Sequence, residues 1–189
     1  LGVSTLFGDA SLENFTPTIA GRQVWSMRLS TVSFPLGVAV RNGKLFSASD
    51  DGTVVALQAE SGAELWRASA GASLSAGVGS DGRFASVVTR DNDVVTLDGG
   101  KVLWRQRVPA KVVTPPLVAG ERVFVMSGDR VVHAFDALDG RRLWRLQRPG
   151  DALTLAQAGV VTAAGNLLLV GQGARLTAVD SLKGTIVWD

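Results

Sequence analysis

The chain has 189 residues, of which 46% are hydrophobic, and it contains 22 glycines but no cysteine and no tyrosine. A formal net charge of +2, without any basic run, gives no case for nucleic-acid binding, and the missing cysteines exclude disulfides, cysteine-ligated metal sites and a thiol nucleophile. No apolar stretch reaches the roughly 18 to 20 residues that span a bilayer, and residues 1–8 lack the features of a signal peptide. We therefore expect a soluble, turn-rich β protein, with any export signal or anchor upstream of residue 1.

In chain order, residues 1–20 show no repeat pattern and are predicted to be a lead-in segment. From residue 21 onward, tryptophan recurs at intervals of 41, 38, 40 and 44 residues, and each tryptophan follows a glycine by four positions. The pairs are Gly21 and Trp25, Gly62 and Trp66, Gly100 and Trp104, Gly140 and Trp144, and Gly184 and Trp188. A period near 40 indicates either a β-propeller or a helical solenoid.

Turn signals within each unit decide between these two architectures. In the third unit, Gly120-Glu121, Gly128-Asp129 and Asp139-Gly140 divide residues 116–146 into four short apolar segments. Such dipeptides accept the positive φ of hairpin turns, and breaks every 8 to 12 residues or so leave no room for ordinary helices. The sequence therefore predicts four-stranded antiparallel units and argues against a helical solenoid.

The predicted fold is an all-β propeller, with about four blades present of a probable eight. Residues 21–189 form this half-propeller, in which residues 21–30 supply an orphan outer strand and the blades span about 33–69, 73–108, 112–148 and 153–189. The tryptophans are expected to wedge between adjacent blades with their N–H groups bonded to backbone. Because four open blades would leave sheet faces uncovered, we also expect self-association of half-propellers.

Two of the units, at residues 50–66 and 128–144, resemble the repeat of pyrroloquinoline quinone enzymes. Three further segments, residues 13–18, 112–116 and 151–155, resemble the BamB family of propeller lipoproteins in the outer-membrane β-barrel assembly machinery. This resemblance implies an eight-bladed, non-enzymatic scaffold at the periplasmic face of the bacterial outer membrane, tethered through a lipidated N-terminal cysteine. It also implies binding to the periplasmic domains of the central barrel subunit, and it leaves open direct contact with unfolded outer-membrane proteins.

The resemblance assigns partner-binding residues to the long connection between Arg148 and Val160. Leucines of a Leu-x-Leu-Arg segment contact the central subunit in that family, and this role carries over to Leu153 and Leu155. Ala156 replaces the arginine, so charge there is either missing or supplied by a neighbour such as Arg148. From the residues alone, packing of these leucines between blades remains the alternative.

A quinone-dependent dehydrogenase is the competing class, since the same repeats build such enzymes. It would need an acidic base and oxygen ligands for Ca²⁺, yet the clusters at Asp50-Asp51 and at residues 91–93 fall where hairpin turns are expected. His133 lies in an apolar strand without a second metal ligand and is expected to be structural. We expect no catalytic residue, cofactor or metal, and a generic propeller that recognises peptides or sugars remains a third possibility.

Overall fold

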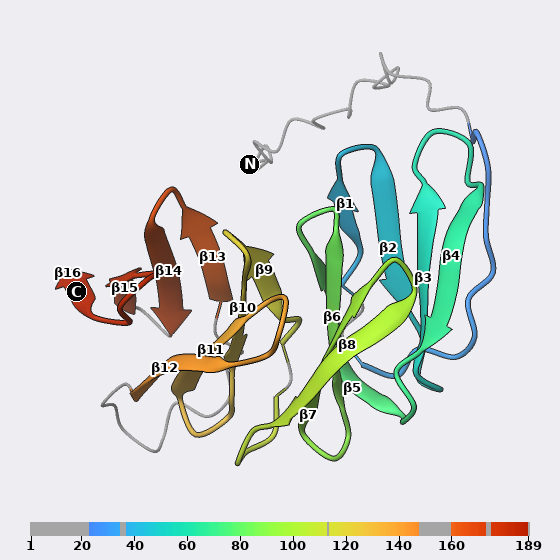
Figure 1. The fold of residues 1–189 in the computed structure, drawn as a ribbon. Coiled ribbons are helices and arrows are strands. Elements are labelled where there is room, and N and C mark those ends of the chain that lie inside the picture. Colours follow the sequence, from blue (N-terminus) through green and yellow to red (C-terminus); the bar gives the residue numbers. More distant parts are fainter. Residues whose placement is uncertain (1–22, 35–36, 113, 148–159, 173–174, 189) are drawn as a thin grey trace, which may run out of the picture.

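A computed structural model describes residues 23–34, 37–112, 114–147, 160–172 and 175–188. Within these ranges the chain forms four four-stranded antiparallel sheets and no helix (Figure 1). The first sheet comprises β1 (Ala39–Arg41), β2 (Lys44–Ala48), β3 (Thr53–Gln58) and β4 (Glu64–Ser69). The second comprises β5 (Leu74–Ser80), β6 (Phe84–Thr89), β7 (Asp93–Asp98) and β8 (Lys101–Arg107). The third comprises β9 (Leu117–Ala119), β10 (Arg122–Met126), β11 (Val131–Asp136) and β12 (Arg142–Gln147), and the fourth β13 (Val160–Ala164), β14 (Leu167–Gln172), β15 (Arg175–Asp180) and β16 (Ile186–Trp188). The predicted all-β architecture of four-stranded units is confirmed.

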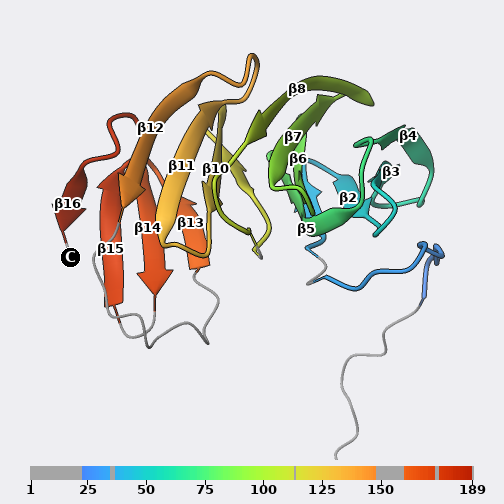
Figure 2. The ribbon, with the colours of Figure 1, turned by 90° about the horizontal axis from the view of Figure 1, so that it is seen from below.

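The sheets follow one another side by side in chain order (Figure 2). Strands within each sheet pair in sequence order, as successive hairpins require. The first strands of neighbouring sheets, β1, β5, β9 and β13, contact one another in turn. The first strand of each sheet therefore lies at a shared inner edge, and the tryptophan-bearing fourth strand lies outermost.

The hydrophobic core consists of three layers, one between each pair of neighbouring sheets. Phe46 and Val54 of the first sheet pack with Leu74 and Val87 of the second. Corresponding clusters join the second sheet to the third and the third to the fourth. Strand β7 is buried on both faces from Val94 to Leu97, because a sheet stands against each of them. Each sheet thus depends on its neighbours for a core, as in other repeat proteins.

A tryptophan of one unit packs against the turn glycine of the next unit. These glycines, Gly62, Gly100, Gly140 and Gly184, all have positive φ. A methyl group added to them would lie 2.7 Å from the Trp25 ring, 3.3 Å from Trp66, 2.5 Å from the Trp104 ring and 2.5 Å from the Trp144 ring, respectively. Each glycine therefore opens its own outer strand and also leaves space for the preceding unit's indole.

Three of the indole N–H groups donate hydrogen bonds across the same boundaries between units. Trp25 donates to the Ala59 carbonyl at 2.9 Å, Trp104 to Ala137 at 2.8 Å, and Trp144 to Ser181 at 3.1 Å. The acceptors are the first residues after the third strands of the first, third and fourth sheets. Each of these indoles is thus fixed by packing and by one hydrogen bond to the following unit.

A β-bulge recurs at the same place in every sheet. The register shifts lie between Ala56 and Leu57, Thr96 and Leu97, Ala134 and Phe135, and Ala178 and Val179. In each case the first of the two residues pairs with the tryptophan of the outer strand. Since a bulge re-aims the side chains beside it, the repeated bulge accounts for the common placement of Trp66, Trp104 and Trp144 against the next unit's glycine.

Residues 23–34 belong to no strand of the described sheets. Trp25 nevertheless occupies, on Gly62, the position that Trp66, Trp104 and Trp144 occupy in the later units. The orphan outer strand assigned to residues 21–30 stays a prediction, as do the remaining blade boundaries.

The contact between Trp104 and Gly140 is expected to be costly to disturb. Gly140→Ala places a methyl group 2.5 Å from the indole at φ +74°, whereas Gly43→Ala has a similar φ of +71° with no atom within 4 Å. We expect Gly43→Ala to lower the free energy of unfolding by about 1 kcal/mol. Gly140→Ala should lower it by about 3 kcal/mol or more, because overpacking adds to the backbone strain. Urea unfolding measures both, and equal losses would refute the steric role of the glycine.

Candidate functional site

The described part of the structure includes the predicted structural tryptophans but not the predicted partner-binding leucines. Leu153 and Leu155 fall within residues 148–159, which lie outside the described residues, so their contact role stays a prediction. Trp25, Trp66, Trp104 and Trp144 pack between successive units as set out above. Trp188, on the outer strand of the fourth sheet, is 46% exposed.

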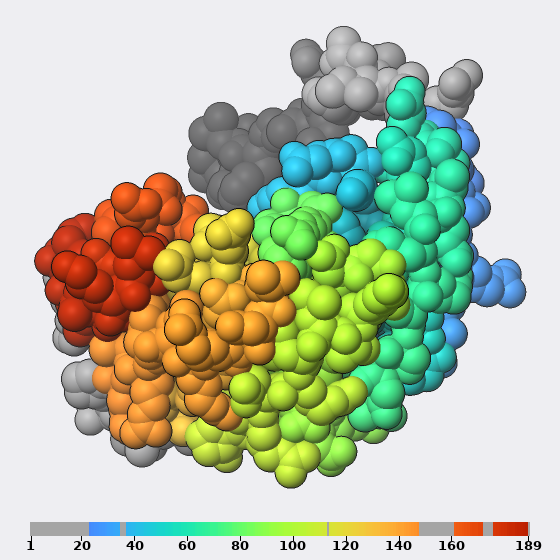
Figure 3. All heavy atoms as spheres, in the orientation of Figure 1, coloured from blue at the N-terminus to red at the C-terminus, as the bar shows by residue number. Residues whose placement is uncertain are grey.

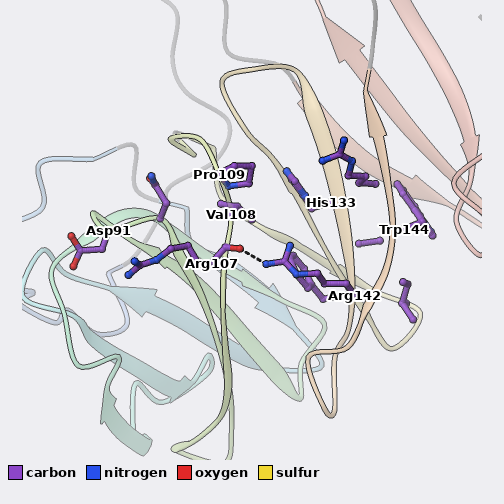
Figure 4. Close-up of a pocket in the computed structure, with 12 residues that line it drawn as sticks. Asp91, Arg107, Val108, Pro109, His133, Arg142 and Trp144 are labelled. Atoms are coloured by element: carbon purple, nitrogen blue, oxygen red, sulfur yellow. Dashed lines mark hydrogen bonds between the residues drawn. The ribbon is translucent and has the colours of Figure 1, made fainter.

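A cavity of about 760 Å³ lies between the second and third sheets (Figure 4). Its walls come from the turn before β7, the end of β8 and the outer two strands of the third sheet. In the space-filling view, the segments around these strands, coloured yellow-green and orange, lie directly against each other (Figure 3). The lining residues are Asp91, Asn92, Arg107, Val108, Pro109, His133, Ala134, Phe135, Arg142, Leu143, Trp144 and Arg145.

Three arginines meet at this cavity, and their partners differ. Arg107 is held by Asp93, with 2.9 Å between Nε and Oδ1. Arg142 donates to the backbone carbonyl of Arg107 across the sheet boundary (Figure 4), and its guanidinium lies 5.3 Å from the centre of the Phe135 ring. Within the described part of the chain, neither Arg142 nor Arg145 forms an ion pair. The cavity is therefore bordered by two cations without carboxylate partners.

His133 lies on the wall of the cavity and is 3% exposed. Its Nε2 lies 3.3 Å from the Ser127 hydroxyl oxygen, within hydrogen-bonding distance. Burial lowers the pKa of His133 below its usual value, and the charges of Arg142 and Arg145 lower it further while Asp129 opposes them. The imidazole is therefore neutral at pH 7, so the arginines carry the positive charge of the site.

Sequence reasoning missed this cavity. Its residues come from four separate segments between residues 91 and 145, and no motif links them. The sequence did contain one indication of the site, which is visible when equivalent positions of the units are compared. Residues 142 and 145 are both arginine, whereas the first unit has Glu64 and Arg67 there. Aligning the units by their tryptophans would have shown the difference.

The described residues contain no group of three or more His, Cys, Asp or Glu side chains that could hold a metal ion. They also contain no helix with the length and apolarity needed to cross a membrane.

Four-stranded antiparallel sheets that share an inner edge and bury their faces against one another define a β-propeller. A family model described as outer membrane protein assembly factor BamB matches residues 9–76 and 50–189. The chain belongs to the BamB family. It is 38% identical over 187 residues to the outer membrane protein assembly factor BamB of Bordetella pertussis, covering 97% of this chain and 48% of that protein. The chain thus spans about half the length of this relative.

Two solved structures share the fold. The crystal structure of BamB from Moraxella catarrhalis matches with a TM-score of 0.74 and 23% identity, over 88% of this chain and 51% of that one. A quinohemoprotein alcohol dehydrogenase from Comamonas testosteroni matches with a TM-score of 0.64 and 19% identity, over 84% and 35% of the two chains. At these identities the likeness concerns the fold alone.

The lowered pKa of His133 predicts a pH dependence of stability. When a histidine binds its proton more weakly in the folded state, the folded protein becomes less stable as pH falls below the histidine pKa of the unfolded state, which is about 6.5. We therefore expect the free energy of unfolding to fall between pH 7 and pH 5, and to fall less in His133→Gln. Asp50, Asp51 and Glu64 have lowered pKa values, so their contributions are lost only below about pH 4.5. Urea titrations at pH 7, 6 and 5 measure the free energy of unfolding of the unmodified chain and of His133→Gln. The same change with pH in both proteins would contradict the prediction.

Proposed function

We propose that this chain is part of a non-catalytic scaffold subunit of the outer-membrane β-barrel assembly machinery. In this proposal it binds the periplasmic domains of the central barrel subunit and aids insertion of outer-membrane proteins. The complete protein is lipid-anchored at the periplasmic face of the outer membrane. The observation that carries the proposal is the family match over residues 9–189, together with relatives named as assembly factors.

The positions of the carboxylates favour a scaffold over a quinone-dependent enzyme. One oxygen of Asp51 lies 2.9 Å from both the Ser49 hydroxyl oxygen and the Thr53 backbone N, both of which donate hydrogen bonds that close the β2–β3 turn. Asp93 is held by Arg107 and lies 3.9 Å from Arg105. The clusters that could have supplied a general base or Ca²⁺ ligands therefore have structural partners, which supports the non-catalytic assignment.

The architecture also suits a binding subunit. Neighbouring sheets bury the middle strands, so the framework is set by packing, while turns and outer strands remain at the surface. Surface loops on a rigid framework are the usual place for recognition residues. Leu153 and Leu155, in the connection between the third and fourth sheets, would supply the partner contact.

Replacing both Leu153 and Leu155 with Asp should weaken binding to the isolated periplasmic domains of the central subunit at least tenfold, because a buried apolar contact would be exchanged for two charges. Leu138→Asp combined with Leu182→Asp is a matched control, since both leucines are exposed in other turns. Titration calorimetry measures the affinities and thermal unfolding the stability. Loss of stability in the 153/155 variant, or equal loss of binding in the control, would favour packing or non-specific effects instead.

We also propose that the isolated chain self-associates. Ile186, Val187 and Trp188 on β16 are about half exposed, although the equivalent Trp104 and Trp144 are covered by a following sheet. A second copy would cover this face and lower its exposed apolar area. Light scattering should give about twice the monomer mass, and Trp188→Glu should shift it toward the monomer. A monomeric mass for the unmodified chain at high concentration would exclude this association.

A further inference from the structure

The outer strands of the first and third sheets differ in charge at one of two equivalent positions, where Glu64 of the first sheet corresponds to Arg142 of the third. In the first sheet, Glu64 and Arg67 flank Trp66 and form an ion pair with 2.9 Å between oxygen and nitrogen. The equivalent residues of the third sheet, Arg142 and Arg145, flank Trp144 and are both cationic. The fold therefore accepts an internally neutralised pair at these positions, but the third sheet has two like charges.

The arginine that follows the tryptophan has an acidic neighbour in the first and second sheets. Arg105 of the second sheet donates to the Ala70 carbonyl and lies 3.9 Å from Asp93. The residue equivalent to Asp93 in the third sheet is Val131, because Asp93 pairs with Arg107 and Val131 pairs with Gln147 at the matching register. Arg145 therefore has no carboxylate where Arg105 has one.

Both arginines, which have no carboxylate partner among the described residues, border the cavity between the second and third sheets, whose other walls combine polar and apolar residues. The Arg142 guanidinium lies over the Phe135 ring on the side of the third sheet, and Val108 with Pro109 lies on the side of the second sheet (Figure 4). Its volume of about 760 Å³ lies in the range of ligand-binding pockets. A guanidinium binds a carboxylate through two parallel hydrogen bonds, and the exposed ring of Pro109 suits an apolar group beside it.

We propose that this cavity binds an acidic peptide segment, in which a carboxylate pairs with Arg142 and Arg145 and a neighbouring aromatic or aliphatic side chain packs on the exposed Pro109 ring. Strand β12 is an edge strand, so its outer backbone groups have no strand partner in the described sheets and are available to a peptide main chain. Asp91 on the rim disfavours a doubly charged phosphate. A singly charged carboxylate on a peptide therefore fits better than a phosphorylated ligand.

The test uses the short peptide acetyl-Phe-Glu-Phe-amide, and acetyl-Phe-Gln-Phe-amide as its uncharged equivalent. Titration calorimetry with the whole chain should show the Glu peptide binding at least tenfold more tightly than the Gln peptide. Arg142→Glu recreates the Glu–Arg pair of the first sheet, so it should still unfold cooperatively, and it should bind the Glu peptide at least tenfold more weakly. Arg141→Glu makes the same charge change at an exposed neighbour that does not line the cavity, and it should bind like the unmodified chain.

Several outcomes would overturn the proposal. Equal affinity for the Glu and Gln peptides would show that the carboxylate is not recognised. Unchanged binding of the Glu peptide by Arg142→Glu would show that the peptide does not bind in this cavity. Equal weakening by Arg141→Glu would indicate a general charge effect. Tighter binding of free 3-phenylpropionate or of phenyl phosphate than of the Glu peptide would assign the site to a small molecule or a phosphate. No heat at millimolar Glu peptide would mean that the cavity binds no such segment.

Discussion

The rest of this structure depends on the contact between one unit's indole and the next unit's turn glycine. Only a residue without a β-carbon leaves room for the ring, and the positive φ of the turn favours the same residue. The contact joins segments more than 30 residues apart, as between Trp104 and Gly140, and three of the indoles add a hydrogen bond across the same boundary. Spacing between successive sheets is thereby fixed at their outer edges.

Fixed spacing at the outer edge allows a continuous core at the inner edge. Middle strands such as β7 and β11 are buried on both faces, and the apolar area removed from water there is the main favourable contribution to folding. No sheet could bury both faces alone, so stability and shape are shared across the array. A framework of this kind holds its surface turns in defined positions, which is what a scaffold subunit requires.

Residues that depart from the repeat indicate positions at which the units differ in function. The bulges, turns and tryptophans recur in every sheet, so they serve the fold. Arg142 and Val131 break that regularity, so that two guanidinium groups without a carboxylate partner among the described residues lie beside one cavity. A framework that tolerates an ion pair at these positions does not require two like charges there, and ligand binding is the physical reason we offer for them.

The sequence by itself determined the repeat period, the all-β architecture and the apolar middle strands, because turns, hairpins and strand propensities follow from short-range backbone chemistry. Gly140 and Trp144 could be recognised as a repeated pair within one unit. Only the tertiary structure showed that Gly140 receives Trp104 of the preceding unit, and that Arg107, His133 and Arg142 meet at one cavity. Such juxtapositions depend on how two sheets are placed against each other, and that placement is set by packing between distant residues, which local sequence patterns do not record.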